Sequence, residues 1–274
     1  MSFSELIINN NRVYHLDVSP DECASTIITV GDPYRVERVS RHFDTIECKR
    51  EHREFVTHTG QINNHRVSVV STGIGTDNID IVLNEIDALH NVDFDTKTPK
   101  SSHTSLTIIR IGTSGALADI PVDSFLVSKA ALGLDGLMYY YPQHKQYIES
   151  DVFPAKPYFT RADEGLLKKA VSHADVFGGL TLTTAGFYAP QGRSLRLQSA
   201  LDLDVVAAYE FNGMAPANIE METAGIYALS ELLGHRAISF NAILANRSKG
   251  MFSKTPAATI DALILHVLHT MFHG

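Results

Sequence analysis

Two carboxylates two residues apart are the strongest chemical signal in this sequence. Glu220 and Glu222 flank Met221, and apolar residues at helical spacing follow at once, from Ala224 onward. A carboxylate in the first turn of a helix is stabilised by free backbone N–H groups and by the helix dipole, which explains one of the two acids. A second carboxylate at such a turn accepts two hydrogen bonds from a vicinal diol, such as a ribose offers. The motif alone leaves helix capping and sugar binding as alternatives.

Arginines stand at two positions where a phosphate group would find donors. Arg35 follows Gly31-Asp-Pro33 at a predicted turn from strand to helix, where free N–H groups add to the guanidinium. An ordinary loop with a surface arginine explains this segment equally well. Arg110 interrupts an apolar run, and because a buried arginine requires a partner, a ligand role carries more weight here. The sequence Gly112-Thr-Ser-Gly115 then adds hydroxyls and accessible amides.

Composition restricts the classes of protein to which the chain can belong. Its 274 residues are 44% hydrophobic and 20% charged, which predicts one globular domain over residues 1–274. No stretch approaches the roughly 20 apolar residues of a membrane span, and the first six residues lack the features of a signal peptide. We therefore expect a cytoplasmic protein with no membrane partner. The formal charge of −8 argues against nucleic-acid binding, which depends on accumulated Lys and Arg.

Cysteines and histidines do not form a metal-binding pattern. Cys23 and Cys48 are the two cysteines, and neither belongs to a CxxC pair. The 13 histidines include no HExxH motif. His266, His269 and His273 recur at helical spacing, and a solvated stripe on a terminal helix is favoured over a metal site. Metal catalysis is not supported.

The elements that must position these residues alternate between strands and helices. Compact β-branched runs and alternating stretches predict strands at residues 26–30, 54–62, 65–72, 106–111, 123–131, 179–184 and 237–245. Apolar residues three and four apart predict helices at 34–43, 78–89, 164–174, 201–211, 224–233 and 259–272. Residues 91–105 are expected to form a surface loop. The tyrosine-rich region 133–159 is expected to be irregular and to serve a pocket, an oligomer face or a surface excursion.

This order of elements predicts an α/β fold with a central mixed, largely parallel twisted sheet flanked by helices. Ligands of such folds bind outside the carboxyl ends of the strands. The unusual residues fall at those ends, namely Gly31, Gly73, Arg110, Thr113, residues 187–193, Glu222 and Asn246.

A series of segments, in order across nearly the whole chain, resembles the nucleoside phosphorylase-I family and most of all its uridine-cleaving members. The segments are His15-Leu16, Gly31-Asp-Pro-Tyr-Arg35, His52-Arg-Glu-Phe55, Ser71-Thr-Gly-Ile-Gly75, Ile109-Arg-Ile-Gly-Thr-Ser-Gly115, Phe187-Tyr-Ala-Pro-Gln-Gly-Arg193, Ile219-Glu-Met-Glu222 and Asn246-Arg247. The resemblance implies a pentosyltransferase. Nucleoside and orthophosphate would reversibly give free base and ribose 1-phosphate through an oxocarbenium-like transition state.

The resemblance also assigns a role to individual residues. Phosphate binding falls to Gly31, Arg35, Arg110, Thr113 and, from a neighbouring subunit, Arg53. Ribose binding falls to Met221, Glu222 and the neighbouring subunit's His15, and base binding to Phe187, Gln191 and Arg193. The residues expected to act in catalysis are Arg110, Arg193 and Glu222, while Glu220 is left with a structural role. Positioning and electrostatics would carry the rate without a side-chain nucleophile.

Base selection is expected at three positions. The pair Gln191 and Arg193 suits a pyrimidine with two carbonyls and one N–H. Purine-cleaving relatives place an aspartate where this chain has Asn246, and a neutral amide cannot easily donate a proton to the base. Uridine is therefore favoured over inosine and adenosine. Departures from the family pattern at Thr76 and at Ala189-Pro190 bear on sugar and base selectivity more than on the reaction class.

Three other functions compete with this interpretation. They are a purine nucleoside phosphorylase, a hydrolytic nucleosidase of the same fold, and a non-catalytic nucleoside-binding paralogue. The arginines Arg35, Arg53 and Arg110 argue against the nucleosidase, because water in place of phosphate would not require them. Intact Glu222 and the same arginines weigh against the binding paralogue.

The roles of His15 and Arg53 imply a homo-oligomer with a dimer as its minimum unit, and the family resemblance implies a hexamer. No cofactor is implied, since orthophosphate is a co-substrate. Family members hold a monovalent cation, K⁺, between subunits near the position of Glu54, where Asn78 here replaces the usual serine.

Overall fold

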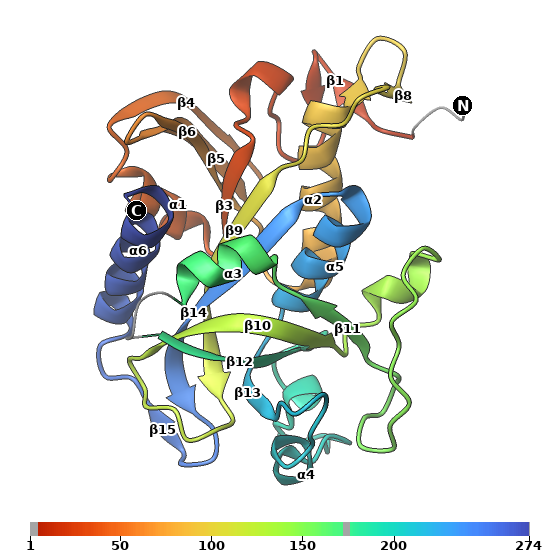
Figure 1. Cartoon of the computed structure of the whole chain (residues 1–274), viewed down its shortest axis with the longest axis vertical. Helices are drawn as coiled ribbons and strands as arrows, with labels where there is room; N and C mark the ends of the chain where they lie inside the picture. The colour runs from red at the N-terminus through yellow and green to blue at the C-terminus, as the bar shows by residue number, and fades with distance from the viewer. Residues whose placement is uncertain (1–4, 172–175, 274) are drawn as a thin grey trace.

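A large mixed sheet forms the centre of the computed structural model, which describes residues 5–171 and 176–273 (Figure 1). Within those residues the sheet has eleven strands in the order β15-β14-β10-β12-β13-β9-β3-β6-β5-β4, with β11 paired to β10. The strands are β3 (Thr26–Val30), β4 (Thr45–His52), β5 (Phe55–Ile62), β6 (His65–Ser71), β9 (Thr107–Ala116), β10 (Phe125–Gly133), β11 (Tyr158–Arg161), β12 (Val176–Thr183), β13 (Pro216–Glu220), β14 (Arg236–Asn246) and β15 (Met251–Phe252). The predicted fold class is confirmed.

Helices cover both faces of this sheet (Figure 1). They are α1 (Pro33–Ser40), α2 (Thr76–Asn91), α3 (Glu164–Ala170), α4 (Leu203–Ala207), α5 (Thr223–Leu233) and α6 (Pro256–Phe272). Short 3₁₀ turns lie at Pro20–Glu22, Leu137–Tyr140 and Ala189–Gln191, and two small hairpins pair β1 (Ile8–Asn9) with β2 (Arg12–Val13) and β7 (Val92–Asp93) with β8 (Thr98–Pro99).

Part of the sheet closes on itself. Strand β14 pairs with β9 in parallel and with β10 in antiparallel orientation, so β9, β13, β12, β10 and β14 form a ring. Each strand of the ring is paired on both sides, so the ring has no free edge, whereas the sheet as a whole ends at β4 and β15. It also brings the ends of strands that are distant in the sequence close together.

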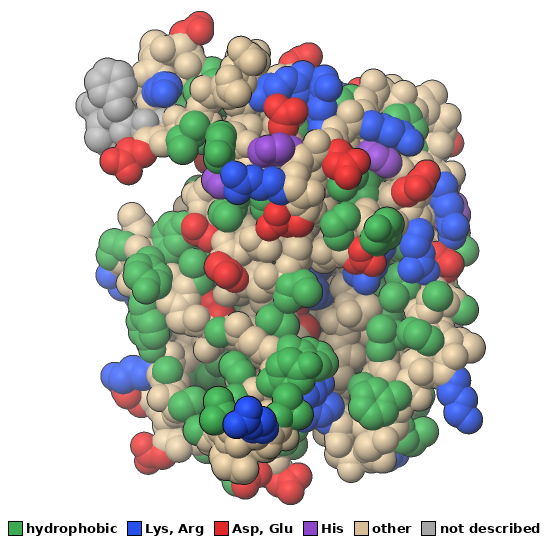
Figure 2. All heavy atoms as spheres, turned by 180° about the vertical axis from the view of Figure 1, so that it is seen from behind, with side chains coloured by type: hydrophobic (Ala, Val, Ile, Leu, Met, Phe, Trp, Pro, Cys, Tyr) green, Lys and Arg blue, Asp and Glu red, His purple; other side chains and the backbone are tan. Residues whose placement is uncertain are grey.

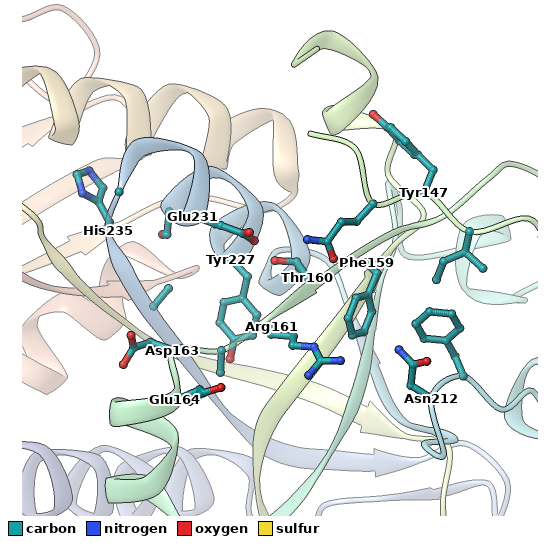
Figure 3. A pocket seen from close by; sticks show the side chains of 17 residues that line it. Tyr147, Phe159, Thr160, Arg161, Asp163, Glu164, Asn212, Tyr227, Glu231 and His235 are labelled. Carbon is teal, nitrogen blue, oxygen red and sulfur yellow. The ribbon is translucent and has the colours of Figure 1, made fainter. Parts of the chain in front are cut away.

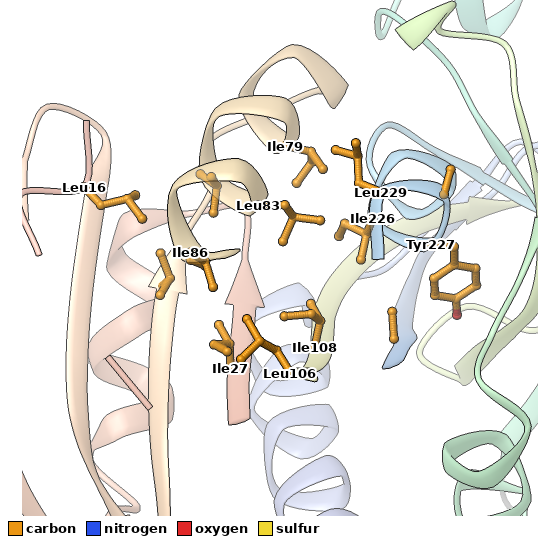
Figure 4. Packing of buried hydrophobic residues seen from close by; sticks show 14 of the residues in the cluster. Leu16, Ile27, Ile79, Leu83, Ile86, Leu106, Ile108, Ile226, Tyr227 and Leu229 are labelled. Atoms are coloured by element: carbon orange, nitrogen blue, oxygen red, sulfur yellow. The ribbon is translucent and has the colours of Figure 1, made fainter. Parts of the chain in front are cut away.

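The continuous apolar character of the central strands follows from the covering of both faces. Ile27 and Ile108 belong to a core cluster with residues of α2 and α5, which Figure 4 shows. Their neighbours Ile28 and Ile109 point to the opposite face and pack with residues of α1 and α6. Because successive side chains of a strand alternate between faces, a strand buried on both faces is apolar at nearly every position.

Tyr227 links helix α5 to two strands. Its buried hydroxyl donates to the carbonyl oxygen of Ser128 at 2.7 Å and accepts from the N–H of Ser239 at 2.8 Å. The ring thus fills the core while its polar end satisfies backbone groups of β10 and β14.

Most predicted elements occur within a few residues of their expected bounds. The strand at 26–30 is confirmed, and the hairpin of β5 and β6 turns at Asn63 and Asn64, whose φ angles are 47° and 63°. Asn tolerates this left-handed conformation, which two-residue hairpins require. The predicted surface loop 91–105 contains the β7–β8 hairpin, and 133–159 is irregular apart from one 3₁₀ turn and the start of β11.

Several predictions of elements were wrong. Of the predicted helix 201–211, only residues 203–207 are helical, as α4. The side chain of Asp202 caps its start. Beyond its end, Asn212-Gly213 turns the chain back with φ angles of 51° and 72°. The strand 106–111 extends to Ala116, because its last residues pair with both β13 and β14. Strands β4, β11, β13 and β15 of the sheet were not predicted. Helix α3 ends at Ala170, and residues 172–174 of its predicted span lie outside the described residues.

The C-terminal histidines divide into two environments. His269 and His273 are exposed on α6 and its end and stack at 5.8 Å, as a solvated stripe predicts. His266 instead lies half-buried against the ring of Phe125 at 5.5 Å. Among residues 5–171 and 176–273, no group of His, Cys, Asp and Glu is arranged to hold a metal ion, and no helix has the length and apolar character of a membrane span. Both cysteines are free.

We predict that Tyr227→Phe lowers the free energy of unfolding by about 1–3 kcal/mol, because it leaves the buried N–H of Ser239 without its acceptor. Tyr140→Phe is the matched control, since the side chain of Tyr140 is 85% exposed. Urea denaturation of both variants measures the difference. Equal stability of the two variants would contradict the structural role given to the Tyr227 hydroxyl.

Candidate functional site

A cavity of about 820 Å³ opens at the carboxyl ends of the central strands. Its lining comes from the β3–α1 turn, the β6–α2 turn, the second half of β9, the β13–α5 turn, residues 187–193 and the β14–β15 hairpin. On the face shown in Figure 2, hydrophobic side chains gather over the lower half, and histidines gather with Lys and Arg in the upper half. The segments that line the cavity are far apart in the sequence, and they meet here because the carboxyl ends of the strands lie side by side.

Arg110 lies at the centre of the polar part of this cavity. Its Nη1 donates to Oδ1 of Asn241 at 2.9 Å and to Oγ of Ser239 at 3.3 Å. Its Nη2 donates to Oε2 of Glu222 at 2.6 Å and lies 3.0 Å from Oε2 of Glu220. Burial lowers the pKa of the Arg110 guanidinium, but the two carboxylates outweigh this effect and raise it overall. The guanidinium is thus charged and held in a fixed orientation.

Gly112 makes room for the arginine. A Cβ atom at this position would lie 2.0 Å from Nη1 and 2.3 Å from Cζ of Arg110. The two residues are two apart on strand β9, so a side chain at position 112 would project from the same face as that of Arg110. Any side chain at position 112 would displace the guanidinium from the carboxylates.

The two carboxylates of the opening motif have different surroundings. Glu220 accepts hydrogen bonds from the N–H groups of Glu222 at 3.0 Å and Thr223 at 2.9 Å, and from the hydroxyls of Thr183 and Thr223. It therefore caps helix α5. Glu222 accepts from the N–H of Gly75 at 2.8 Å and from Arg110. Capping and ligand binding are thus divided between the acids, with Glu220 saturated by protein donors.

Burial raises the pKa of the Glu222 carboxyl, and the charge of Arg110 opposes that shift. Two carboxylates face a single guanidinium, so one negative charge of the group is in excess. Glu222 carries that excess because it has fewer donors than Glu220. A hydroxyl group of a ligand that donated a hydrogen bond to Glu222 would stabilise this excess negative charge.

Arg35 supplies a second buried guanidinium beside Arg110. Its Nη1 donates to the carbonyl oxygen of Ile111 at 3.2 Å, whereas its Nε has no hydrogen-bond partner among the described residues. Burial, followed by repulsion from Arg110, lowers the pKa of Arg35 to about 10. Two guanidinium groups held near each other in a partly desolvated cavity repel each other, and an anion between them would be attracted to both. Gly31 and Thr113 line the same part of the cavity.

Phe187, Gln191 and Arg193 form a further part of the cavity wall. The Arg193 guanidinium lies 3.8 Å from the centre of the Phe187 ring, and its Nη1 donates to Oε1 of Gln191 at 2.6 Å. Burial, with the charge of Arg247, lowers the pKa of Arg193 to about 10. The wall thus offers an aromatic face beside oriented polar groups, which suits a flat heterocycle.

Asn246 does not line this cavity, contrary to its predicted role in selecting the base. Its amide nitrogen donates to the carbonyl oxygens of Ile120 at 2.9 Å and Ala118 at 3.2 Å. Its Oδ1 accepts from Ser248 and Lys249. The side chain fixes the turn after β14, and Leu244, Ala245 and Phe252 face the cavity instead.

His15 and Arg53 lie outside the cavity of their own chain. Nδ1 of His15 pairs with Oε1 of Glu85 at 2.7 Å, and Nη2 of Arg53 donates to the hydroxyl of Tyr14 at 3.3 Å. Met221 and Glu54 do line the cavity. The remaining predicted site residues are brought together as expected.

Sequence reasoning missed several residues that build the site. Ser239 and Asn241 hold Arg110, and their alternation with apolar residues in β14 was an available signal. Phe252 enters the cavity from β15, which follows a turn ending in Gly250 with a φ of 60°. A hairpin at that glycine was also readable from the sequence.

Comparisons with known proteins find relatives by sequence and by fold. Residues 25–261 match the model of the phosphorylase superfamily. A uridine phosphorylase of Thermococcus kodakarensis is 30% identical over 88% of this chain and 80% of its own length. A DeoD-type purine nucleoside phosphorylase of Listeria welshimeri is 28% identical over 82% of this chain and 83% of its own. A crystal structure of a Trypanosoma brucei nucleoside phosphorylase, described as showing uridine phosphorylase activity, is similar with a TM-score of 0.87 and 28% identity over 98% of this chain and 100% of that one.

We predict that Glu220→Gln and Glu222→Gln differ in their effect on stability. Glu220→Gln should cost about 3–5 kcal/mol, because it breaks a buried charged network that caps α5. Glu222→Gln should cost less than about 1 kcal/mol, since it removes the carboxylate that is in excess and Arg110 keeps its pair with Glu220. Thermal unfolding with no ligand measures both. A larger loss in Glu222→Gln would reverse the roles assigned to the two acids.

Proposed function

The chain belongs to the phosphorylase superfamily, and on that premise we propose that it is a uridine phosphorylase, which converts uridine and orthophosphate reversibly into uracil and ribose 1-phosphate. The observation that carries the proposal is the pair of buried guanidinium groups, Arg35 and Arg110, beside the carboxylate of Glu222. A hydrolytic enzyme has no need of such an anion site.

Phosphate binding is proposed at Arg35, Arg110, Thr113 and the backbone of Gly31. The repulsion between the two guanidinium groups, which lowers the pKa of Arg35, is relieved by a bound dianion. Charge-assisted hydrogen bonds offset the hydration that phosphate loses. The bound phosphate would be aimed at C1′ of the nucleoside, which is the main requirement of the reaction.

Ribose binding is proposed at Met221 and Glu222. The Glu222 carboxylate would accept hydrogen bonds from the ribose hydroxyls and so offset the negative charge left in excess beside Arg110. As the N-glycosidic bond breaks, positive charge develops on the ribose. The carboxylate and the phosphate stabilise it until a phosphate oxygen bonds to C1′.

Base binding is proposed at Phe187, Gln191 and Arg193. The electron pair of the broken bond remains on the pyrimidine, and the guanidinium of Arg193 stabilises this negative charge. Because the carbonyl oxygen of Gln191 accepts from Arg193, its amide N–H groups are the ones left to donate to a base carbonyl. Leu244, Ala245 and Phe252 limit the space around the ring.

A purine nucleoside phosphorylase is the second candidate, favoured by the similarity to the Listeria welshimeri enzyme. Asn246 cannot decide between the two, because its amide is bonded to the backbone of the β9–β10 connection. The choice rests on Gln191 and Arg193, whose donors match a pyrimidine carbonyl.

The proposal includes an oligomer in which His15 and Arg53 complete the site of a neighbouring subunit. The groups Arg35, Arg110, Glu220 and Glu222 sum to no net charge, so a phosphate dianion calls for a further cation. A neighbour's Arg53 would supply it. A dimer is the minimum unit and a hexamer an extension of it. A monovalent cation near Glu54 and a cytoplasmic role in pyrimidine salvage stay predictions.

We predict that release of uracil from uridine depends on orthophosphate and that uridine is cleaved faster than inosine or adenosine. Rates with and without phosphate, followed by absorbance for each nucleoside, measure both. Equal uracil release in phosphate-free buffer would identify a nucleosidase, and faster inosine cleavage a purine enzyme. Tight uridine binding without uracil release would identify a binding protein.

We also predict complementation between subunits. Arg53→Ala and Glu222→Gln should each be nearly inactive. When the two variants are mixed in equal amounts, about half of the dimers contain one chain of each, and one of the two sites in such a dimer has all its groups. The mixture should therefore regain roughly a quarter of wild-type activity. The matched control mixes Arg35→Ala with Glu222→Gln, whose residues lie in one cavity, and should regain none. Recovery in the control alone, or in neither mixture, would refute the shared site.

A further inference from the structure

Carboxylates outside the site described above differ in their exposure to water. A second cavity, of about 760 Å³, lies between β11 and α5 and is lined by Asp163, Glu164 and Glu231 (Figure 3). Glu164 and Glu231 are exposed, so water solvates them and they need no partner in the protein. Glu85 on helix α2 is instead only 6% exposed and lines neither cavity. A buried carboxylate must be hydrogen-bonded or paired with a cation, so the partners of Glu85 indicate what it does.

The hydrogen bonds that Glu85 accepts come from two adjacent residues, His15 and Leu16. Its Oε1 accepts from the N–H of His15 at 3.0 Å, and its Oε2 accepts from the N–H of Leu16 at 2.9 Å. Its Oε1 also lies 2.7 Å from Nδ1 of the His15 ring. Within residues 5–171 and 176–273, no Lys or Arg forms an ion pair with Glu85. The carboxylate therefore depends on this dipeptide to replace the water that it loses on burial.

The loop that carries His15 is fixed to the core on both sides. The N–H of Val13 donates to the carbonyl oxygen of Val18 at 3.0 Å, and Val13, Leu16 and Val18 are each 1% exposed. The side chain of His15 is 28% exposed and lies outside the cavity of its own chain. Its ring meets the Tyr14 ring edge to face at 5.0 Å. The loop thus holds an oriented imidazole at the surface, where the site of the same chain does not use it.

The carboxylate of Glu85 also decides which ring nitrogen of His15 carries the proton. An ionised carboxylate only accepts hydrogen bonds, so Nδ1 is the protonated nitrogen. In the neutral ring Nε2 then keeps its lone pair and is an acceptor. No hydrogen bond to Nε2 forms within the part of the chain that the structure describes. A hydroxyl group from outside the chain can therefore donate to this nitrogen.

We propose that Glu85 is a positioning residue, which orients His15 so that Nε2 accepts a hydrogen bond from the ribose 5′-hydroxyl of a nucleoside in the neighbouring subunit's site. The inference rests on the proposed function, in which Glu222 takes the vicinal 2′- and 3′-hydroxyls and a neighbour's His15 completes the site. The 5′-hydroxyl is the one ribose hydroxyl that this arrangement leaves without an acceptor.

Glu85 acts through His15 and does not touch the substrate. It fixes the imidazole ring before the ligand arrives, which lowers the entropy cost of binding. It also places negative charge behind the ring, which strengthens Nε2 as an acceptor. A glutamine at this position could turn its NH2 group toward Nδ1, which would then have to give up its proton, and the ring would lose its fixed tautomer.

The test compares phosphorolysis of uridine with that of 5′-deoxyuridine, which lacks the hydroxyl in question. The wild-type oligomer is expected to have a kcat/KM at least about tenfold higher for uridine. Glu85→Gln should lower kcat/KM for uridine about fivefold and leave that for 5′-deoxyuridine unchanged. His15→Ala should remove the preference for uridine, and adding Glu85→Gln to it should have no further effect. Glu37→Gln, an exposed carboxylate on α1, is the matched control and should change neither rate.

A second measurement needs no variant at position 85, where Gln could prevent folding because it replaces a buried carboxylate. In ¹⁵N spectra of the wild-type oligomer, Nδ1 of His15 should carry the proton. The Nε2 signal should shift when uridine is added without phosphate and should stay unchanged with 5′-deoxyuridine. Thermal unfolding and sedimentation show which variants are folded and assembled.

Several results would overturn the inference. An equal loss of both rates in folded Glu85→Gln would leave Glu85 with a structural role only. Equal cleavage of both substrates by the wild-type chain would remove the 5′-hydroxyl contact, and an unprotonated Nδ1 would contradict the assigned tautomer. Release of uracil from neither substrate by the wild-type chain would overturn the proposed function itself, and that result is distinct because it appears before any variant is made.

Discussion

Arg110 lies inside the closed part of the sheet with one positive charge against two carboxylates, and much of the site is arranged to keep it there. Ser239 and Asn241 accept from one of its nitrogens, and Glu222 accepts from the other. Gly112 leaves the space that the guanidinium fills. An isolated buried charge would be strongly destabilising, whereas this one is paired and almost fully hydrogen-bonded. The same arrangement leaves Glu222 as the acid that a ligand hydroxyl can approach.

The closed ring of strands explains how these groups meet. Arg110 pairs with Ser239 across parallel strands β9 and β14, and the end of β9 meets β13 in antiparallel register at Ile219 and Gly115. The acids that follow β13 are thereby held against the arginine within β9. Helix α5 begins at this point, and because Glu220 caps it, the position of Glu222 is fixed by the start of the helix. Sheet closure and helix capping thus together fix the positions of the Arg110 guanidinium and the Glu222 carboxylate.

The two cavities use opposite charge arrangements within one fold. The first places buried guanidinium groups where an anion is proposed to bind, and the second, between β11 and α5, is lined by the carboxylates of Asp163, Glu164 and Glu231 against one guanidinium, that of Arg161. Helix α5 contributes to both, since its N-terminus carries Glu222 and its C-terminal half carries Ser230 and Glu231.

The sequence alone determined much of the local structure and most of the residues that line the first cavity. Apolar runs predicted β3, most of β9 and most of β14, and helical spacing predicted α2, α5 and α6, because these patterns depend on neighbours within a few residues. It also identified Arg35, Arg110, Gln191, Arg193 and Glu222 as residues of one site. Tertiary structure decided the rest: the carboxylate of Glu220 caps α5 through Thr223, the N–H of Gly75 reaches Glu222, Asn246 turns to the backbone, and β11 and α5 line a second cavity. These outcomes depend on contacts between residues as much as 147 positions apart, such as Gly75 with Glu222, and no local pattern encodes such a distance.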